Sequence, residues 1–290
     1  MRLAAALLLL PALTGCGALA DTGTGVQVAA GFYPLQYVAE RVAGNDAQVE
    51  VLTQPGAEPH DATLSVRETA LVAEADVVVV AGGVQPSVDD AVANAAENAT
   101  IVDTSSSDFE TSNKPAIRPD DPHFWLDPLL MADLGDAVAD ALVNTDPDHA
   151  DTYRGNAADL RTDLQQLDRA YEQGLAGCER STVVVSHDAF GYLDRYGLEF
   201  APIAGLSPGA EPTPADLSRL QDLIRAEGIT TVFSERLVSP RLTETLADDL
   251  GIRTAILDPI EGLTDETADE DYLSLMRANL AALEKANDCR

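Results

Sequence analysis

Three of the four histidines in this 290-residue chain, His60, His123 and His187, follow strand-like or turn-rich segments. An aspartate, Asp258, ends a further apolar segment in the same way. Imidazole nitrogens and a carboxylate oxygen are donors that bind Zn²⁺, whereas a zinc finger needs pairs of ligands close together in the sequence. Because these four residues are far apart, the pattern predicts a metal site that only the tertiary fold assembles.

The segments between these residues alternate short apolar runs with helical patterns, which is typical of α/β proteins with parallel sheets. Two α/β lobes are therefore expected. Strands are predicted at residues 26–30, 48–53, 76–81 and 99–103 in the first lobe and at 182–186, 198–202, 230–234 and 253–257 in the second. Helices are predicted at residues 35–42, 65–74, 86–97, 189–196, 214–227 and 240–249. Open α/β sheets build ligand sites at the carboxyl ends of their strands, so one cleft between the lobes is expected to hold all four candidate ligands.

Residues 149–175 contain no proline and carry apolar side chains at helical spacing, which predicts one long amphipathic helix. Such a helix is a stiff connector, so the two lobes are expected to keep a nearly fixed orientation. The expected organisation is a signal peptide at residues 1–16, a flexible linker at 17–25, an N-terminal lobe at 26–148, the connector helix at 149–176 and a C-terminal lobe at 177–290.

The first residues predict export from the cytoplasm. An apolar run at residues 3–13 follows Arg2 and is too short to span a bilayer, which is typical of a secretory signal. The Leu-Thr-Gly-Cys sequence that ends at Cys16 resembles the cleavage box of bacterial lipoproteins, in which the cysteine carries the lipid. The alternative is an ordinary signal peptide with an incidental cysteine. Both interpretations place the mature chain outside the cytoplasm, and the first anchors it to the cell membrane.

Cysteine usage fits an oxidising compartment. Lipidation of Cys16 would leave Cys178 and Cys289, an even pair, and we expect them to form a disulfide. Two buried thiols are the alternative.

The composition is strongly acidic, with 49 Asp and Glu residues against 18 Lys and Arg residues and a formal net charge of −31. This charge repels nucleic acid and anionic lipid headgroups, so a polyanionic ligand is not expected. It also concentrates divalent cations near the surface without selecting among them. Solubility in a saline habitat is the simpler explanation for the charge.

Several short motifs resemble those of a known family, the metal-binding lipoproteins of bacterial ABC importers for zinc and manganese. The resemblance extends from Val26 to the C-terminal helix. The matching motifs, in chain order, are Pro59-His60, Asp121-Pro122-His123 with Trp125-Leu126-Asp127-Pro128, Ser186-His187 with Ala189-Phe190-Gly191-Tyr192, and Leu257-Asp258-Pro259. Asp127 is expected to cap the helix that follows it.

The resemblance implies two α/β lobes bridged by a rigid helix, with the metal between them. It implies that His60 and His123 are the ligands of the N-terminal lobe and that His187 and Asp258 are those of the C-terminal lobe. It also implies a membrane permease and its ATPase as partners. The binding protein itself is expected to be a monomer.

Zinc is the expected metal. Three imidazoles and one carboxylate suit a four-coordinate Zn²⁺ ion, whereas Mn²⁺ prefers more oxygen ligands. Manganese-preferring members of the family usually carry a carboxylate at the position of His187. The predicted function is therefore an extracytoplasmic high-affinity receptor that captures Zn²⁺ and delivers it to an ABC permease. A Mn²⁺ receptor of the same architecture is the alternative.

Three further features bear on the site. Glu235 ends a predicted strand on the same sheet edge and is expected to hydrogen-bond a liganding imidazole, although a salt bridge to Arg236 explains it equally well. His149 is expected to be a surface or capping residue at the start of the connector helix. Residues 103–121 lack the histidines that many zinc-binding members of the family carry there, so no metal-gathering role is expected for them.

Two other classes of function are an enzyme and an adhesin. Ser186-His187-Asp188 contains the residue types of a catalytic triad, but adjacent side chains on an extended segment point to opposite faces. The chain has no HExxH motif, and four protein ligands leave no position for an activated water, so no enzyme activity is expected. A secreted zinc hydrolase becomes an alternative if Asp258 does not coordinate. An adhesin is the third class, and nothing in the sequence supports adhesion directly.

Overall fold

The computed structural model describes residues 25–96, 98–107, 109, 111, 118 and 120–290. The predicted signal peptide, the lipidation site at Cys16 and nearly all of the predicted linker lie outside the described residues. Within the described residues, no helix combines the length and the apolar composition that crossing a membrane requires.

The first lobe is built on a four-stranded parallel sheet with the order β2-β1-β3-β4. Its elements are β1 (Val26–Ala30), α1 (Tyr33–Ala43), β2 (Ala47–Val51), α2 (Val66–Glu74), β3 (Val77–Val80), α3 (Pro86–Ala95) and β4 (Thr100–Asp103). The central strand β3 consists of four buried valines. Its alternating side chains pack with α2 and α3 on one face of the sheet and with α1 and α4 on the other, so both faces are covered.

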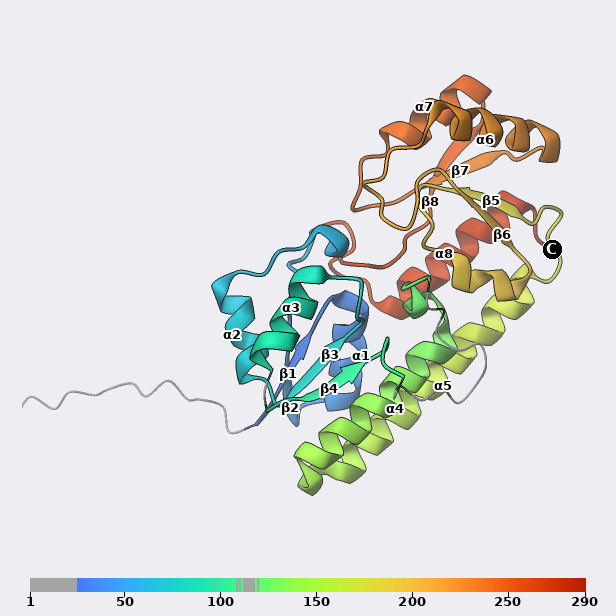
Figure 1. Ribbon diagram of the computed structural model, residues 1–290. Coiled ribbons are helices and arrows are strands. Elements are labelled where there is room, and N and C mark those ends of the chain that lie inside the picture. Colours follow the sequence, from blue (N-terminus) through green and yellow to red (C-terminus); the bar gives the residue numbers. More distant parts are fainter. Residues whose placement is uncertain (1–24, 97, 108, 110, 112–117, 119) are drawn as a thin grey trace, which may run out of the picture.

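The second lobe repeats the same topology, with the strand order β6-β5-β7-β8. Its elements are β5 (Thr182–Val185), β6 (Glu199–Pro202), α6 (Pro214–Glu227), β7 (Thr231–Ser234), α7 (Arg241–Leu250), β8 (Arg253–Ile256) and α8 (Tyr272–Asn287). The expected fold class, two parallel-sheet α/β lobes, is confirmed (Figure 1).

One predicted helix differs in type. The segment expected as a helix at residues 189–196 is a 3₁₀ helix, η4 (Gly191–Tyr196). It ends at Gly197, whose φ of 85° is in the left-handed region that glycine adopts without strain. The short 3₁₀ helices η1 (Pro59–Asp61), η2 (Phe124–Leu126) and η3 (Pro147–His149) complete the described elements between the strands and longer helices.

A pair of long helices joins the lobes. The helix expected after Asp127 is α4 (Pro128–Thr145), and the Asp127 carboxylate caps it by accepting from the Leu129 backbone N–H at 2.8 Å. The predicted connector helix is α5 (Ala150–Leu175), which runs beside α4 and beneath both lobes (Figure 1). It contacts α1 of the first lobe and α8 of the second, so both lobes are packed on one long helix.

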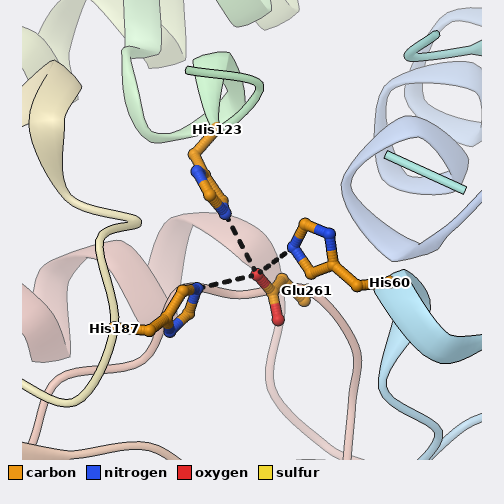
Figure 2. Close-up of side chains that lie close together, drawn as sticks. All are labelled: His60, His123, His187 and Glu261. Carbon is orange, nitrogen blue, oxygen red and sulfur yellow. Dashed lines mark ion pairs between the residues drawn. The ribbon is translucent and has the colours of Figure 1, made fainter. Parts of the chain in front are cut away.

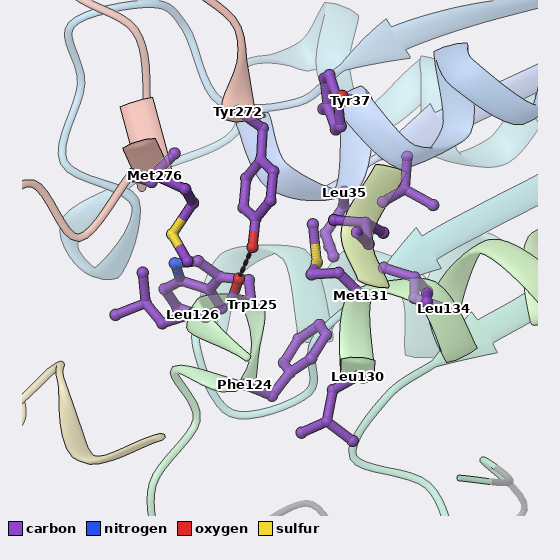
Figure 3. Packing of buried hydrophobic residues seen from close by; sticks show 14 of the residues in the cluster. Leu35, Tyr37, Phe124, Trp125, Leu126, Leu130, Met131, Leu134, Tyr272 and Met276 are labelled. Atoms are coloured by element: carbon purple, nitrogen blue, oxygen red, sulfur yellow. Dashed lines mark hydrogen bonds between the residues drawn. The ribbon is translucent and has the colours of Figure 1, made fainter. Parts of the chain in front are cut away.

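The lobes also share a continuous hydrophobic core. Trp125, from the segment before α4, is buried against Phe124, Tyr272 and Met276 (Figure 3). The Tyr272 hydroxyl donates to the Trp125 carbonyl at 2.5 Å, and the Trp125 indole N–H donates to the Pro259 carbonyl at 2.7 Å. These bonds join a segment of the first half of the chain to the start of α8 and to the loop after β8.

The predicted disulfide between Cys178 and Cys289 is present. It links the turn after α5 to the residues after α8, at the end of the chain.

Candidate metal centre

Four side chains converge between the lobes, namely those of His60, His123, His187 and Glu261 (Figure 2). The Nε2 atoms of the three histidines lie 3.5, 3.7 and 3.6 Å, respectively, from Oε1 of Glu261. These four atoms are buried, and none has a hydrogen-bond partner among the residues that the structure describes. Unpaired buried polar atoms cost free energy, and a cation bound by all four would remove that cost.

Local structure explains how each histidine reaches the centre. His60 lies in η1 after β2, where the Glu58 carboxylate accepts from the backbone N–H groups of His60 and Asp61 at 3.1 and 3.2 Å. His123 precedes η2 and is held by Asp121, while His187 follows the buried strand β5. The structure therefore brings together the three histidines that the sequence analysis singled out, two from the first half of the chain and one from the second.

The fourth residue of the centre is Glu261, and the expected ligand Asp258 is not part of the cluster. Oδ2 of Asp258 lies 3.1 Å from Nε of Arg236, and its Oδ1 accepts from the Ile260 backbone N–H at 2.8 Å. Sequence reasoning missed Glu261 because it lies in a loop beyond the end of β8. The sequence offered one signal for this ligand, because Glu261 is the single acidic residue in the otherwise apolar segment 259–263.

Two carboxylates orient the imidazoles of His123 and His187 by binding the Nδ1 atoms, which face away from the centre. Nδ1 of His123 lies 2.8 Å from Oδ1 of Asp121, and Nδ1 of His187 lies 2.6 Å from Oε1 of Glu235. A carboxylate that holds the proton on Nδ1 leaves the Nε2 lone pair free to face the centre. Of the two contacts expected for Glu235, the structure has the one with a histidine. Asp121 was missed, although its position two residues before His123 was the available signal.

The charges of the centre are strongly coupled. Burial lowers the pKa of His187. The hydrogen bond with Glu235 and the negative charge of the nearby Glu261 outweigh the effect of burial, and they raise the pKa of His187 to about 10. Burial raises the pKa of Glu261, but His187 and His60 outweigh this effect and lower it to about 2. Burial also lowers the pKa of His60, and Glu261 and Glu58 more than compensate, so the net shift is upward. The metal-free centre therefore retains protons that a cation would displace.

The remaining histidine, His149, lies outside the centre. Its side chain is 48% exposed, and its Nδ1 lies 2.6 Å from Oδ2 of Asp146. This surface position agrees with the expectation from the sequence.

Comparison with known proteins identifies the family. A family model described as the periplasmic zinc-uptake complex component A, ZnuA, matches residues 28–286. The chain belongs to the ZnuA family. The resemblance inferred from the motifs is thus confirmed, and the family is described as a component of a zinc-uptake complex.

Two ZnuA-family relatives show how far the similarity extends. The zinc-binding lipoprotein AdcA of Streptococcus pneumoniae (strain ATCC BAA-255 / R6) is 34% identical over 275 residues, which cover 89% of this chain and 55% of AdcA. The chain therefore spans about half the length of the streptococcal relative. The high-affinity zinc uptake system protein ZnuA of Bacillus subtilis (strain 168) is 28% identical over 284 residues, or 92% of this chain and 89% of that protein.

Solved structures agree with this ZnuA-family assignment. Zn(II)-bound AdcA from Streptococcus pneumoniae superposes with a TM-score of 0.77 at 32% identity, covering 91% of this chain and 58% of that one. The laminin-binding protein Lmb of Streptococcus agalactiae superposes with a TM-score of 0.80 at 28% identity, covering 90% of this chain and 99% of that one.

Proposed function

We propose that this protein is an extracytoplasmic receptor that binds Zn²⁺ and delivers it to an ABC permease for import. The observation that supports the proposal most is the set of four buried, unpartnered donor atoms on His60, His123, His187 and Glu261. We propose these four residues as the ligands, with Glu261 in the role that the sequence analysis gave to Asp258. Asp121 and Glu235 would hold two of the imidazoles in the binding tautomer.

The donor set favours zinc over manganese. Three imidazole nitrogens and one carboxylate oxygen match the four-coordinate sites that Zn²⁺ forms, whereas a Mn²⁺ site needs more oxygen ligands. A manganese receptor of the same architecture is the alternative. We expect no catalysis, because Glu261 supplies the fourth donor and the position that a hydrolase would leave for water is filled.

We propose that the loaded protein docks as a monomer on a membrane permease, whose ATPase drives import. We also propose that a lipid on Cys16 anchors the chain on the extracytoplasmic face of the cell membrane. The lipoprotein named among the relatives supports this location.

Elemental analysis tests the metal assignment. The mature protein is equilibrated with an equimolar mixture of Zn²⁺ and Mn²⁺ and then dialysed extensively. One zinc per chain is expected in the wild type, and almost none in His187→Ala. His149→Ala is the matched control, since it removes a histidine outside the centre and should retain one zinc. If the wild type retains mostly manganese, the cargo is manganese instead of zinc. If the wild type retains no metal, the receptor role is refuted.

Adhesion is a second candidate function, and a specific likeness favours it. Lmb is described as a bifunctional protein with adhesin and metal transporting activity, and its fold matches this chain with a TM-score of 0.80. We propose to measure binding of the zinc-loaded protein to immobilised laminin, with bovine serum albumin as the control surface. Saturable binding to laminin alone would support adhesion, whereas equal binding to both surfaces would refute it.

A further inference from the structure

The residue before Glu261 has an unusual backbone. Ile260 has a φ of 59°, in the left-handed region that β-branched residues rarely adopt. Among residues other than glycine in the described part of the chain, only Asp288 shares a positive φ, and aspartate tolerates that region better. The Ile260 side chain is fully buried. A strained residue of this kind persists only where its surroundings hold it in place.

Hydrogen bonds hold each peptide group that leads to Ile260. Asn279 on α8 binds Asp258 twice, accepting from its backbone N–H at 2.9 Å and donating to its carbonyl at 2.6 Å. The Pro259 carbonyl accepts from the Trp125 indole at 2.7 Å. The Asp258 carboxylate then accepts from the Ile260 backbone N–H at 2.8 Å, which closes a turn over these three residues.

The second oxygen of Asp258 is directed to an arginine. Nε of Arg236 lies 3.1 Å from Oδ2 of Asp258, and Nη1 of Arg236 donates to Oε2 of Glu266 at 3.0 Å. The guanidinium offsets a negative charge that is only 5% exposed and close to two other buried carboxylates, Glu235 and Glu261. Oδ1 of Asp258 therefore accepts a hydrogen bond outside the cluster of histidines, and Oδ2 lies at ion-pair distance from Arg236 without a hydrogen bond.

We propose that Asp258 is a positioning residue that holds Ile260 in the left-handed conformation and thereby directs Glu261 at the three histidines. This inference rests on the proposed function, because it gives Asp258 a role in zinc binding without making it a ligand. If the Ile260 N–H loses its acceptor, the backbone relaxes toward negative φ and carries the Glu261 carboxylate away from the imidazoles.

The two possible roles of Asp258 respond differently to substitution. Asparagine keeps an acceptor oxygen for the Ile260 N–H, so Asp258→Asn preserves the turn but removes the charge. Asp258→Ala removes the acceptor. Glycine adopts positive φ without help, so adding Ile260→Gly to Asp258→Ala restores the conformation without restoring the side chain. If Asp258 were itself a ligand, asparagine should not preserve zinc affinity and glycine at position 260 should not restore it.

Zinc affinity, measured by competition with a chromogenic chelator, tests the proposal. We expect Asp258→Ala to bind zinc about 10- to 100-fold more weakly than the wild type, the usual effect of losing a residue that orients a ligand. Asp258→Asn should lose clearly less, and Asp258→Ala/Ile260→Gly should recover part of the loss. Asp89→Ala is the matched control, because Asp89 accepts from the backbone N–H of Gly83, another residue with positive φ, outside the centre. Its affinity should equal that of the wild type.

Absorption of the Co²⁺-substituted protein separates this role from general stability, since the visible spectrum of Co²⁺ follows its coordination geometry. The spectrum should change in Asp258→Ala and return toward the wild type in the double variant. Unchanged affinity in Asp258→Ala would overturn the proposal, and so would equal losses in Asp258→Ala and Asp258→Asn with no recovery by glycine. If the wild type itself binds no zinc, the proposed function fails, which is a distinct result.

Discussion

Zinc binding at neutral pH should release a proton from His187. Its pKa of about 10 in the metal-free protein lies well above the ordinary value of 6.5, because Glu235 and Glu261 outweigh the effect of burial. At pH 7 the ring is therefore protonated, and removing that proton costs about 4 kcal/mol at 1.36 kcal/mol per pH unit. Glu261 is already ionised, since its pKa is lowered to about 2, and contributes no proton. The apparent affinity for zinc should rise about tenfold per pH unit from pH 7 toward pH 10.

Replacing Glu235 isolates the cause of this pH dependence. Glu235→Gln removes the carboxylate beside Nδ1 of His187, so the pKa of His187 should fall and fewer protons should be released at pH 7.5 than in the wild type. Glu266→Gln is the control, because Glu266 is exposed and pairs with Arg236 instead of a histidine. Calorimetric zinc titrations in buffers of different ionisation enthalpy count the protons released. Zinc binding without proton release in the wild type, or equal release in wild type and Glu235→Gln, would refute the reasoning.

Three further predictions concern the stability of the protein. Zinc at 1,000 times its dissociation constant should stabilise the wild type and His149→Ala by about 4 kcal/mol in denaturant unfolding, but not His187→Ala. The metal-free protein should lose stability as the pH rises from 6.5 to about 10. The pKa of His187 is higher in the folded protein than in the unfolded chain, so its protonation stabilises the fold fully below pH 6.5 and no longer above about pH 10. Denaturant unfolding across this pH range checks the direction of the change. Replacing Cys178 and Cys289 by alanine should lower the unfolding free energy by at most about 4 to 5 kcal/mol, while zinc stoichiometry, measured in parallel, stays at one.

Elements with strong local signals could be predicted from the sequence. Helix α6 was predicted with its observed bounds, because Thr213 and Asp216 form a capping box at its start and Gly228 adopts a left-handed conformation at its end. Strand β3 was evident from four consecutive valines, because a β-branched apolar run of this length favours a strand that is covered on both faces. The segment that became η4 carried a helical pattern, but its six residues were too few to establish an α-helix against tertiary packing.

The centre was predictable only in part. The three histidines follow strands or turn motifs, so topology alone directs them to one cleft. Asp258 satisfies the same rule, yet Arg236 and Asn279 determine where its atoms point, and both contacts come from parts of the chain remote in sequence. Glu261 reaches the centre through the left-handed backbone of Ile260, which no periodicity or propensity of the sequence indicates.

The only tryptophan of the chain has a useful location. The centroid of its ring lies 5.1 Å from that of His123, and its indole N–H is bonded to the loop that carries Glu261. Its ultraviolet emission therefore originates at one place, beside the proposed ligand His123. A single fluorophore of this kind would let the filling and emptying of the centre be followed in real time without a label, including during transfer to a membrane partner.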